Sequence, residues 1–299
     1  MAISPKHIAD AAKARELYLH TQGPKEAKAD WRFAVRDARK LATAALRASK
    51  LLSDIEGALA RDGRHALVFR QVLAPPVSQD QFKLYCPAYS KSAEITGRPM
   101  LNAAEVAATI WDRLDLGVAT WAAGGTTPER HEIETFVRVS STLIGLQQIS
   151  TARRSRLAQE QEGAVISALK SDGWTKLPSK LIDTRAAVPT LHFMHKTRFA
   201  TATTAAQEVD IACGLQNSYV LAMECKVTND ATNSVKRIND VLKKATAWKD
   251  HWGSFVMTAA LLQGVIAAKD VQRLSDAGVH VFWSHDLAKF KKWLRAQMV

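Results

Sequence analysis

The sequence lacks the features that define several large protein classes. Its 3 cysteines, Cys86, Cys213 and Cys225, are odd in number and form no CxxC pair, so neither a disulfide framework nor a cysteine zinc site is indicated. No apolar run reaches the roughly 18 residues of a membrane span. The opening segment, Met-Ala-Ile-Ser-Pro-Lys, has no apolar signal region. We therefore expect a cytoplasmic protein without a membrane segment.

Several catalytic motifs are missing as well. No GxSxG segment supports a serine nucleophile, and no glycine-rich phosphate loop is present. His131, Glu132 and Glu134 lie close together, but Thr135 occupies the position where a zinc-binding HExxH helix needs its second histidine. We interpret these side chains as surface charge.

Positive charge, in contrast, is abundant. The 41 Lys and Arg residues outnumber the 29 Asp and Glu residues, which gives a formal net charge of +12. A basic surface attracts phosphate and releases counterions on binding, so the composition favours a nucleic-acid partner. The chain of 299 residues is 47% hydrophobic, enough for one large core or two medium ones.

Hydrophobic periodicity divides the chain into two parts. Residues 4–62, residues 102–123 and a segment beginning near Pro128 have helical spacing. From Trp174 onward, short apolar strands alternate with amphipathic helices, which predicts an α/β fold with some parallel pairing. We predict a helical region over residues 1–150 and an α/β domain over residues 151–299.

Two segments and one helix carry donors suited to DNA. Segment 86–100 is expected to be a loop that follows a helix start at Ser78, and segment 183–206 is expected to be long, irregular and polar. An ordinary surface connection is the alternative for segment 86–100, whereas a loop as long as segment 183–206 inside a compact domain is usually functional or disordered. The helix predicted over residues 233–251 adds basic side chains. The candidate DNA contacts are Gln79, Lys91, Arg98, His192, His195, Lys196, Arg198, Lys236 and Arg237.

Residues 207–227 are predicted to form a β-hairpin around a polar turn at residues 216–218. Asp210, Glu224 and Lys226 interrupt its otherwise apolar strands. Glu224 and Lys226 are two residues apart and share a face, and hairpin pairing can bring Asp210 beside them. Charges in a buried strand are costly unless they are paired or bind a metal, so these side chains are candidate site residues.

The chemistry of these residues suits phosphodiester hydrolysis. Asp210 and Glu224 offer the hard oxygen ligands that Mg²⁺ prefers, and Lys226 can orient or deprotonate the attacking water and stabilise negative charge. The competing interpretation is a surface salt bridge between Glu224 and Lys226. A ββα-metal nuclease built on His192 and His195 is disfavoured, because no matching Asn/His metal spacing follows.

The spacing Asp210, thirteen residues, Glu224, one residue, Lys226 resembles the PD-(D/E)XK nuclease superfamily, and within it type II restriction endonucleases. The segments Glu-Val-Asp-Ile at 208–211, Glu-Cys-Lys-Val at 224–227 and Val-Phe-Trp-Ser-His-Asp at 281–286 are similar to XamI-type restriction enzymes. Val209 departs from the pattern, since it stands where the superfamily often has proline.

This resemblance implies a restriction-endonuclease-like core, with a mixed central sheet flanked by helices, over residues 154–294. It implies Mg²⁺ held by Asp210, Glu224 and the Cys225 carbonyl, with Glu162 as an extra carboxylate and Glu160 as its rival. It also implies a homodimer that cuts double-stranded DNA at a palindromic sequence, with the N-terminal region embracing DNA or forming the dimer. A structure-specific or repair nuclease, and a non-catalytic DNA-binding protein on the same core, remain as alternatives.

Overall fold

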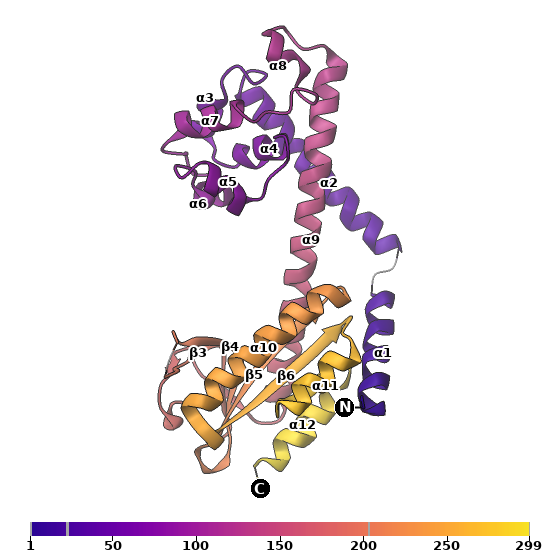
Figure 1. Ribbon diagram of the computed structural model, residues 1–299, viewed down its shortest axis with the longest axis vertical. Helices are drawn as coiled ribbons and strands as arrows, with labels where there is room; N and C mark the ends of the chain where they lie inside the picture. The colour runs from indigo at the N-terminus through magenta and orange to yellow at the C-terminus, as the bar shows by residue number, and fades with distance from the viewer. Residues whose placement is uncertain (1, 22–23, 203, 299) are drawn as a thin grey trace. The chain divides into compact units, whose positions relative to one another are not determined.

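A computed structural model describes residues 2–21, 24–202 and 204–298 (Figure 1). The chain folds into two compact units. The helical unit comprises residues 24–152, and the sheet unit combines the residues up to 23 with residues 153–299. The boundary between them falls inside one long helix, α9 (Arg130–Ser171).

Short capped helices surround the core of the helical unit. Asp54 caps one of them by accepting from the Gly57 amide at 2.8 Å, and Ser78 caps another in a reciprocal capping box with Gln81. Phe69, Phe82 and Phe136 are fully buried in the core of this unit. Together with the first part of α9, its helices are α2 (Pro24–Ala48), α3 (Ile55–Arg61), α4 (His65–Gln71), α5 (Gln79–Tyr85), α6 (Lys91–Thr96), α7 (Ala103–Trp111) and α8 (Thr120–Gly124).

The structure corrects two sequence expectations in this unit. Segment 86–100 is not a loop throughout, because α6 occupies its centre between a Ser90 cap and Gly97, whose φ of 76° ends the helix. A helix of this length is too short to give a periodic signal, although both end signals are present in the sequence. The helix expected over residues 102–123 ends at Trp111, and α8 follows separately.

A mixed seven-stranded sheet forms the centre of the sheet unit. Its strand order is β1-β3-β4-β5-β6-β7, and β2 also pairs with β3. The β3–β4 and β4–β5 pairs are antiparallel, whereas β5–β6 and β6–β7 are parallel. The strands are β1 (Thr175–Lys176), β2 (Leu181–Ile182), β3 (His192–Phe199), β4 (Gln207–Gly214), β5 (Val220–Thr228), β6 (Val256–Gly264) and β7 (His280–Trp283).

Helices cover both faces of this sheet. On one face, Val165 of α9 and Phe290 of α12 (Leu287–Ala296) pack with Ile211 and Met223. On the other face, α10 (Ala231–Trp252) and α11 (Ala268–Asp276) contribute buried apolar side chains, and Figure 1 shows α10 lying across β5 and β6. The predicted α/β class, with a restriction-endonuclease-like core and a largely helical N-terminal region, is confirmed.

The first helix, α1 (Pro5–His20), packs with the sheet unit, whereas the sequence division had grouped it with residues 21–150. Ala11 and Ala14 are buried in the cluster that contains α10 and α11 residues. The Ser4 amide donates to Gln272 Oε1 at 3.0 Å. Ala11 and Ala14 of α1 are buried because this surface of the sheet unit covers them. The helical spacing alone does not reveal which surface that is.

The expectation of an irregular segment over residues 183–206 is wrong, because β3 lies inside it and pairs with β4. Phe193, Met194 and Phe199 are fully buried. Met194 and Phe199, five residues apart, pack in the same cluster, although strict alternation would put them on opposite faces. Lys196, between them, has a left-handed φ of 54°, and this switch of face obscures the strand pattern in the sequence.

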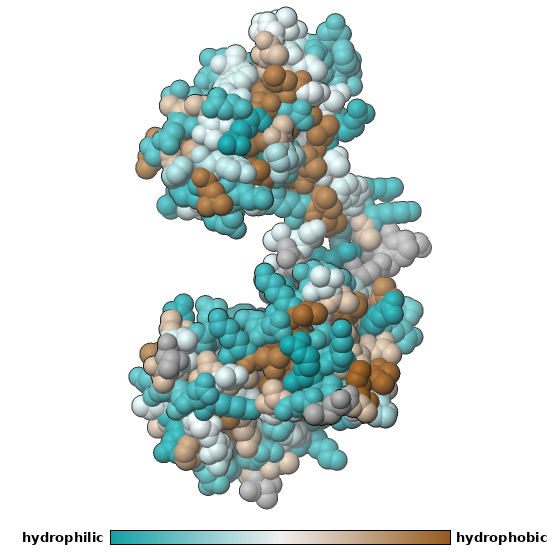
Figure 2. All heavy atoms as spheres, in the orientation of Figure 1, coloured by the Kyte–Doolittle hydropathy of each residue, from teal (hydrophilic) through white to brown (hydrophobic). Residues whose placement is uncertain are grey.

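None of the helices in the described parts of the chain is long and apolar enough to cross a membrane. Figure 2 shows hydrophilic residues over much of the visible surface of each unit, with hydrophobic areas between them.

Candidate active site

The β4–β5 hairpin forms as predicted and brings two carboxylates together. Ile211 pairs with Met223, and the next position on each strand is Asp210 and Glu224. Asp210 Oδ2 accepts a hydrogen bond from the Cys225 amide at 2.8 Å. Its carboxylate therefore lies against the backbone of β5, beside the residue that follows Glu224.

Glu224 is fully buried and its two oxygens have different surroundings. Oε2 accepts from Lys226 Nζ at 2.6 Å and from Lys244 Nζ, on α10, at 2.9 Å. Oε1 is buried and has no hydrogen-bond partner among the described residues. A buried carboxylate oxygen without a partner is costly, so this atom is a site where a cation or donor would be stabilised.

Lys226 lies close to three carboxylates. Its Nζ lies 3.9 Å from Asp210 Oδ2 and 3.5 Å from Asp240 Oδ2, in addition to its hydrogen bond with Glu224. The side chain is only 11% exposed, so this is not the surface salt bridge that the sequence left as an alternative.

Glu162 of α9 joins this site through β3. Lys196 Nζ donates to Glu162 Oε1 at 2.6 Å and to Asp210 Oδ1 at 3.0 Å, and His195 Nε2 lies 2.7 Å from Glu162 Oε2. Glu162 is buried, whereas Glu160 is exposed. Of the two rival carboxylates, Glu162 is therefore the one next to the Asp210 cluster.

The charges of the cluster stabilise one another in the ionised state. Burial alone would raise the pKa of Asp210, but the Lys226 charge, the Cys225 amide and Lys196 outweigh it and lower that pKa. Burial would lower the pKa of Lys226, but the charges of Glu224 and Asp210 outweigh it and raise that pKa. Lys226 is therefore an ammonium at neutral pH in this arrangement, which suits stabilisation of negative charge.

The lowered pKa of Asp210 predicts how the cluster responds to acid. The ionised carboxylate contributes stability above its ordinary pKa of 3.8, and this contribution is lost as pH falls through the lower folded value. In urea unfolding, the free-energy difference between wild type and Asp210→Asn should stay constant from about pH 5 to pH 8 and shrink in stronger acid. A difference that grows below about pH 4 would contradict the lowered pKa.

The donor set fits a hard divalent cation. Asp210 and Glu224 supply carboxylate oxygens, and Glu224 Oε1 has no other partner among the described residues. The N–H and C=O of an extended residue point to the same edge, so the Cys225 carbonyl faces Asp210 as its amide does. Burial raises the pKa of the Cys225 thiol, which packs in the apolar cluster on the other face. Within the described residues, no three His, Cys, Asp or Glu side chains are grouped as a complete metal site.

A cleft of about 560 Å³ opens over these groups. It is lined on one side by Lys196 and Arg198 of β3, and on the other by Lys226 of β5 with Asp240 and Lys244 of α10. Glu208 and Asp210 also line it, so cationic and acidic side chains both face the cleft, a combination that can hold both a phosphate and a cation.

The predicted DNA contacts of the sheet unit have varied surroundings. Lys196 and Arg198 line the cleft, and Arg198 lies 3.6 Å from Glu208. Lys236 is exposed and Arg237 half-buried on α10. His192 is half-buried at the start of β3, with Nδ1 2.9 Å from the Thr190 carbonyl. Of the two histidines, His195 is the one that contacts the cluster.

Two of the predicted DNA-contacting residues of the helical unit bind other side chains of the same unit. Gln79 Nε2 donates to Glu94 Oε1 at 2.7 Å, and Lys91 pairs with Asp80. Arg98 is exposed, and its carbonyl accepts from the Gly63 amide. Gln79 thus belongs to a buried polar network, while Arg98 keeps its guanidinium at the surface.

Lys244 and Asp240 were missed as site residues. They are four residues apart on α10 and flank its apolar stripe of Ile238, Val241 and Ala245, so they reach the same part of β5. Their helical spacing is visible in the sequence. The packing of that face of α10 on β5 depends on tertiary contacts, which no pattern in the sequence specifies.

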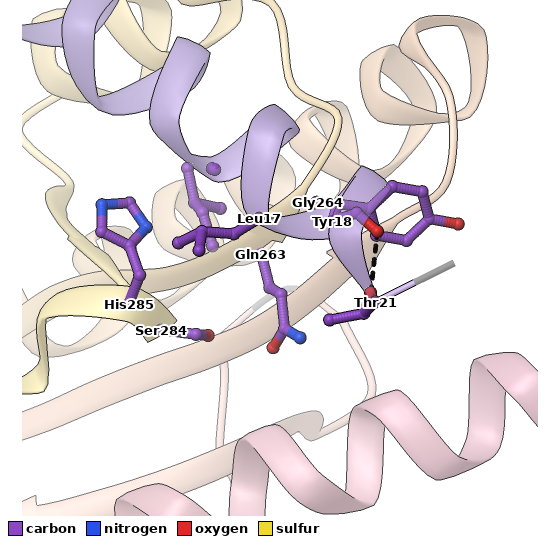
Figure 3. Close-up of a pocket in the computed structure, with 9 residues that line it drawn as sticks. Leu17, Tyr18, Thr21, Gln263, Gly264, Ser284 and His285 are labelled. Atoms are coloured by element: carbon purple, nitrogen blue, oxygen red, sulfur yellow. Dashed lines mark hydrogen bonds between the residues drawn. The ribbon is translucent and has the colours of Figure 1, made fainter. Parts of the chain in front are cut away.

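A second pocket, of about 180 Å³, shares no lining residue with the cleft. Leu17 and Tyr18 of α1 and Thr21, which follows the helix, line one side. Gln263 and Gly264 at the end of β6 line the other, with Ser284 and His285 beside them (Figure 3). None of the predicted site residues lines this pocket.

The fold and site together define a restriction-endonuclease-like α/β protein. The sequence model of the XamI restriction endonuclease family matches residues 50–283, and the chain belongs to this family. The type II restriction enzyme XamI of Xanthomonas campestris pv. amaranthicola is 28% identical over 187 residues, which is 62% of this chain and 66% of that enzyme. The match thus spans slightly less than two thirds of the relative's length.

Among solved structures, protein VC1899 from Vibrio cholerae matches with 11% identity and a TM-score of 0.30, over 86% of this chain and 57% of that one. A likeness of this degree carries no argument about fold or function.

Proposed function

We propose that this protein is a Mg²⁺-dependent type II restriction endonuclease that cuts double-stranded DNA at a short specific sequence. The observation that carries the proposal is the convergence of Asp210, Glu224 and Lys226 in one buried cluster, in a chain of the XamI restriction endonuclease family. The net charge of +12 supports a polyanionic substrate.

In the proposed site, Asp210, Glu224 and the Cys225 carbonyl would hold the cation, with Glu162 as the extra carboxylate nearby. When bound, Mg²⁺ supplies charge neutralisation at the phosphate and a water of lowered pKa. Lys226 holds its proton at Nζ and orients the attacking water while it stabilises the charge that develops on the phosphate. Lys244 anchors Glu224 through Oε2, and Oε1 has no hydrogen-bond partner among the described residues.

DNA would reach this cluster along the cleft of mixed charge. Lys196 and Arg198 line it, and His195 lies next to them on β3. Lys236 and Arg237 on α10 add positive charge, and His192 stands at the start of β3. We propose that these side chains contact the DNA backbone, which positions the duplex without specifying its sequence.

We assign recognition of the DNA sequence to the helical unit, with Gln79, Lys91 and Arg98 as the candidate base contacts. The same unit is also a candidate for enclosing the DNA or for forming the dimer. Two copies acting as a homodimer would place one site on each strand of a palindromic sequence, since two-fold protein symmetry matches two-fold DNA symmetry. Light scattering with and without DNA tests this assembly.

Plasmid digestion tests the proposed function directly. Purified protein and supercoiled plasmid should give discrete fragments in Mg²⁺ and intact plasmid in EDTA. A smear would instead mean cutting without sequence specificity. Uncut plasmid together with a DNA mobility shift would replace the nuclease by a non-catalytic DNA-binding protein.

A further inference from the structure

Lys196 lies between two carboxylates of the proposed cation site. Its Nζ is 2.6 Å from Glu162 Oε1 and 3.0 Å from Asp210 Oδ1, so one ammonium joins a helix residue to a strand residue. The Lys196 side chain is 56% exposed, whereas those of Glu162 and Asp210 are 9% and 16% exposed. The ammonium can therefore turn into solvent while both carboxylates stay in place.

The other two lysines of the cluster differ from Lys196 in both burial and partner. Lys226 and Lys244 both bond Glu224 Oε2, and their side chains are only 11% and 15% exposed. They are fixed within the cluster, whereas Lys196 reaches it from the rim of the cleft. Among the three, Lys196 is the cation that can exchange.

The backbone of β3 is bent to place Lys196 there. Its φ of 54° lies in the left-handed region, which is unfavourable for a residue other than glycine. The flanking residues Met194 and Phe199 pack in one cluster, as Val209 and Ala212 of the partner strand do, so strand alternation is interrupted at this point on both strands. Strain retained beside a cluster of charges indicates a functional position.

We propose that Lys196 is a built-in counter-ion, which holds Asp210 and Glu162 before a divalent cation binds and then turns to a DNA phosphate. This inference rests on the proposed function. Lys196 is a positioning residue under this proposal, because it acts through the two carboxylates. Since Lys196 and a divalent cation compete for Asp210 Oδ1, cation binding frees the ammonium for DNA, and each ligand strengthens binding of the other.

Calcium titration of the full-length protein without DNA tests the competition. By calorimetry, Lys196→Met should bind Ca²⁺ about three- to tenfold more tightly than wild type, since a half-exposed ion pair is modest in strength. Lys196→Arg keeps the charge and should keep affinity near that of wild type. Lys180→Met is the matched control: Lys180 is exposed and lines a neighbouring cavity with Lys196, so it removes an equal charge nearby without freeing Asp210.

A second measurement tests the coupling to DNA. Fluorescence anisotropy should show that Ca²⁺ strengthens duplex binding less in Lys196→Met than in wild type, because the variant has no ammonium to release. Equal strengthening in both proteins would contradict the proposed transfer of Lys196 to phosphate.

The remaining outcomes separate this inference from the nuclease proposal. If wild type cuts plasmid DNA but Lys196→Met binds Ca²⁺ no more tightly, or Lys180→Met gives the same gain, the counter-ion role fails and the function stands. If plasmid stays intact in Mg²⁺ while Lys196→Met alone gains Ca²⁺ affinity, the counter-ion role stands and the nuclease proposal fails. Absence of Ca²⁺ binding by both proteins overturns the inference.

Discussion

Replacing Lys226 by Met should reduce Mg²⁺-dependent DNA cleavage by about 10²- to 10⁴-fold, the range for loss of a positioned proton-transfer or charge-stabilising group. Lys226 lies within reach of Asp210, Glu224 and Asp240 and keeps its proton at neutral pH because the surrounding carboxylates raise its pKa. The variant loses that ammonium but keeps the three proposed cation ligands. Initial rates on a plasmid with a single site provide the measurement.

Glu224→Gln should cause a loss at least as large, because it removes the carboxylate that offers Oε1 to the cation. The double variant Glu224→Gln/Lys226→Met should cleave DNA only slightly more slowly than the less active of the two single variants, because the effects of substituting residues that act as a unit are not additive. Additive losses would mean that the two side chains act independently, in conflict with their 2.6 Å hydrogen bond.

DNA binding should survive both substitutions, and this separates a catalytic defect from a binding defect. Mobility shifts without metal should give affinities within a few-fold of wild type. Two exposed residues outside the cluster provide matched controls: Lys170→Met near the end of α9, and Glu134→Gln in the helical unit. Cleavage that persists undiminished in Glu224→Gln and Lys226→Met would remove this cluster from the mechanism.

The sequence predicted the hairpin because its signal is local. Apolar alternation, the polar turn and the two-residue spacing of Glu224 and Lys226 are all contained in residues 207–227. Helical spacing in the sequence also distinguishes Glu162 from Glu160. Glu162 lies on the same helix face as Val165, Ile166 and Leu169, which pack towards the sheet, and Glu160 does not. Helical phase alone therefore identifies the inward carboxylate.

Other parts of the site depend on tertiary structure. The sequence pattern predicts a polar loop around Lys196, because its left-handed backbone interrupts the alternation that would reveal β3. Lys244 reaches Glu224 only because α10 lies over β5. The packing of α1 with the sheet unit depends likewise on a distant partner. In each case the deciding contact joins residues far apart in sequence, and local patterns carry no information about it.

The largest stability effect is expected in the helical unit, at a buried ion pair. Arg70 and Glu94 are 1% and 3% exposed, and Arg70 Nη2 donates to Glu94 Oε1 at 2.9 Å. Arg70→Met would leave the Glu94 carboxylate buried without its cation, which destabilises a protein by about 3–5 kcal/mol. Urea unfolding with hydrogen exchange should show this loss in residues 24–152, while the sheet unit keeps its protection. Arg130→Met, at an exposed pair with Glu134, is the matched control and should leave stability unchanged.

The double variant Arg70→Met/Glu94→Met distinguishes the origin of that loss. Removing both charges removes the buried unpaired carboxylate, so part of the stability should return, as it does when ion pairs are replaced by apolar residues. Recovery should be incomplete, because Tyr89 and Gln79 also donate to Glu94 and would lose their acceptor. Freed from Glu94, the Gln79 amide would be available for the DNA contact proposed for it. A double variant with partly restored stability but altered DNA-sequence preference would link this buried network to base recognition, whereas unchanged preference would make Gln79 a structural residue.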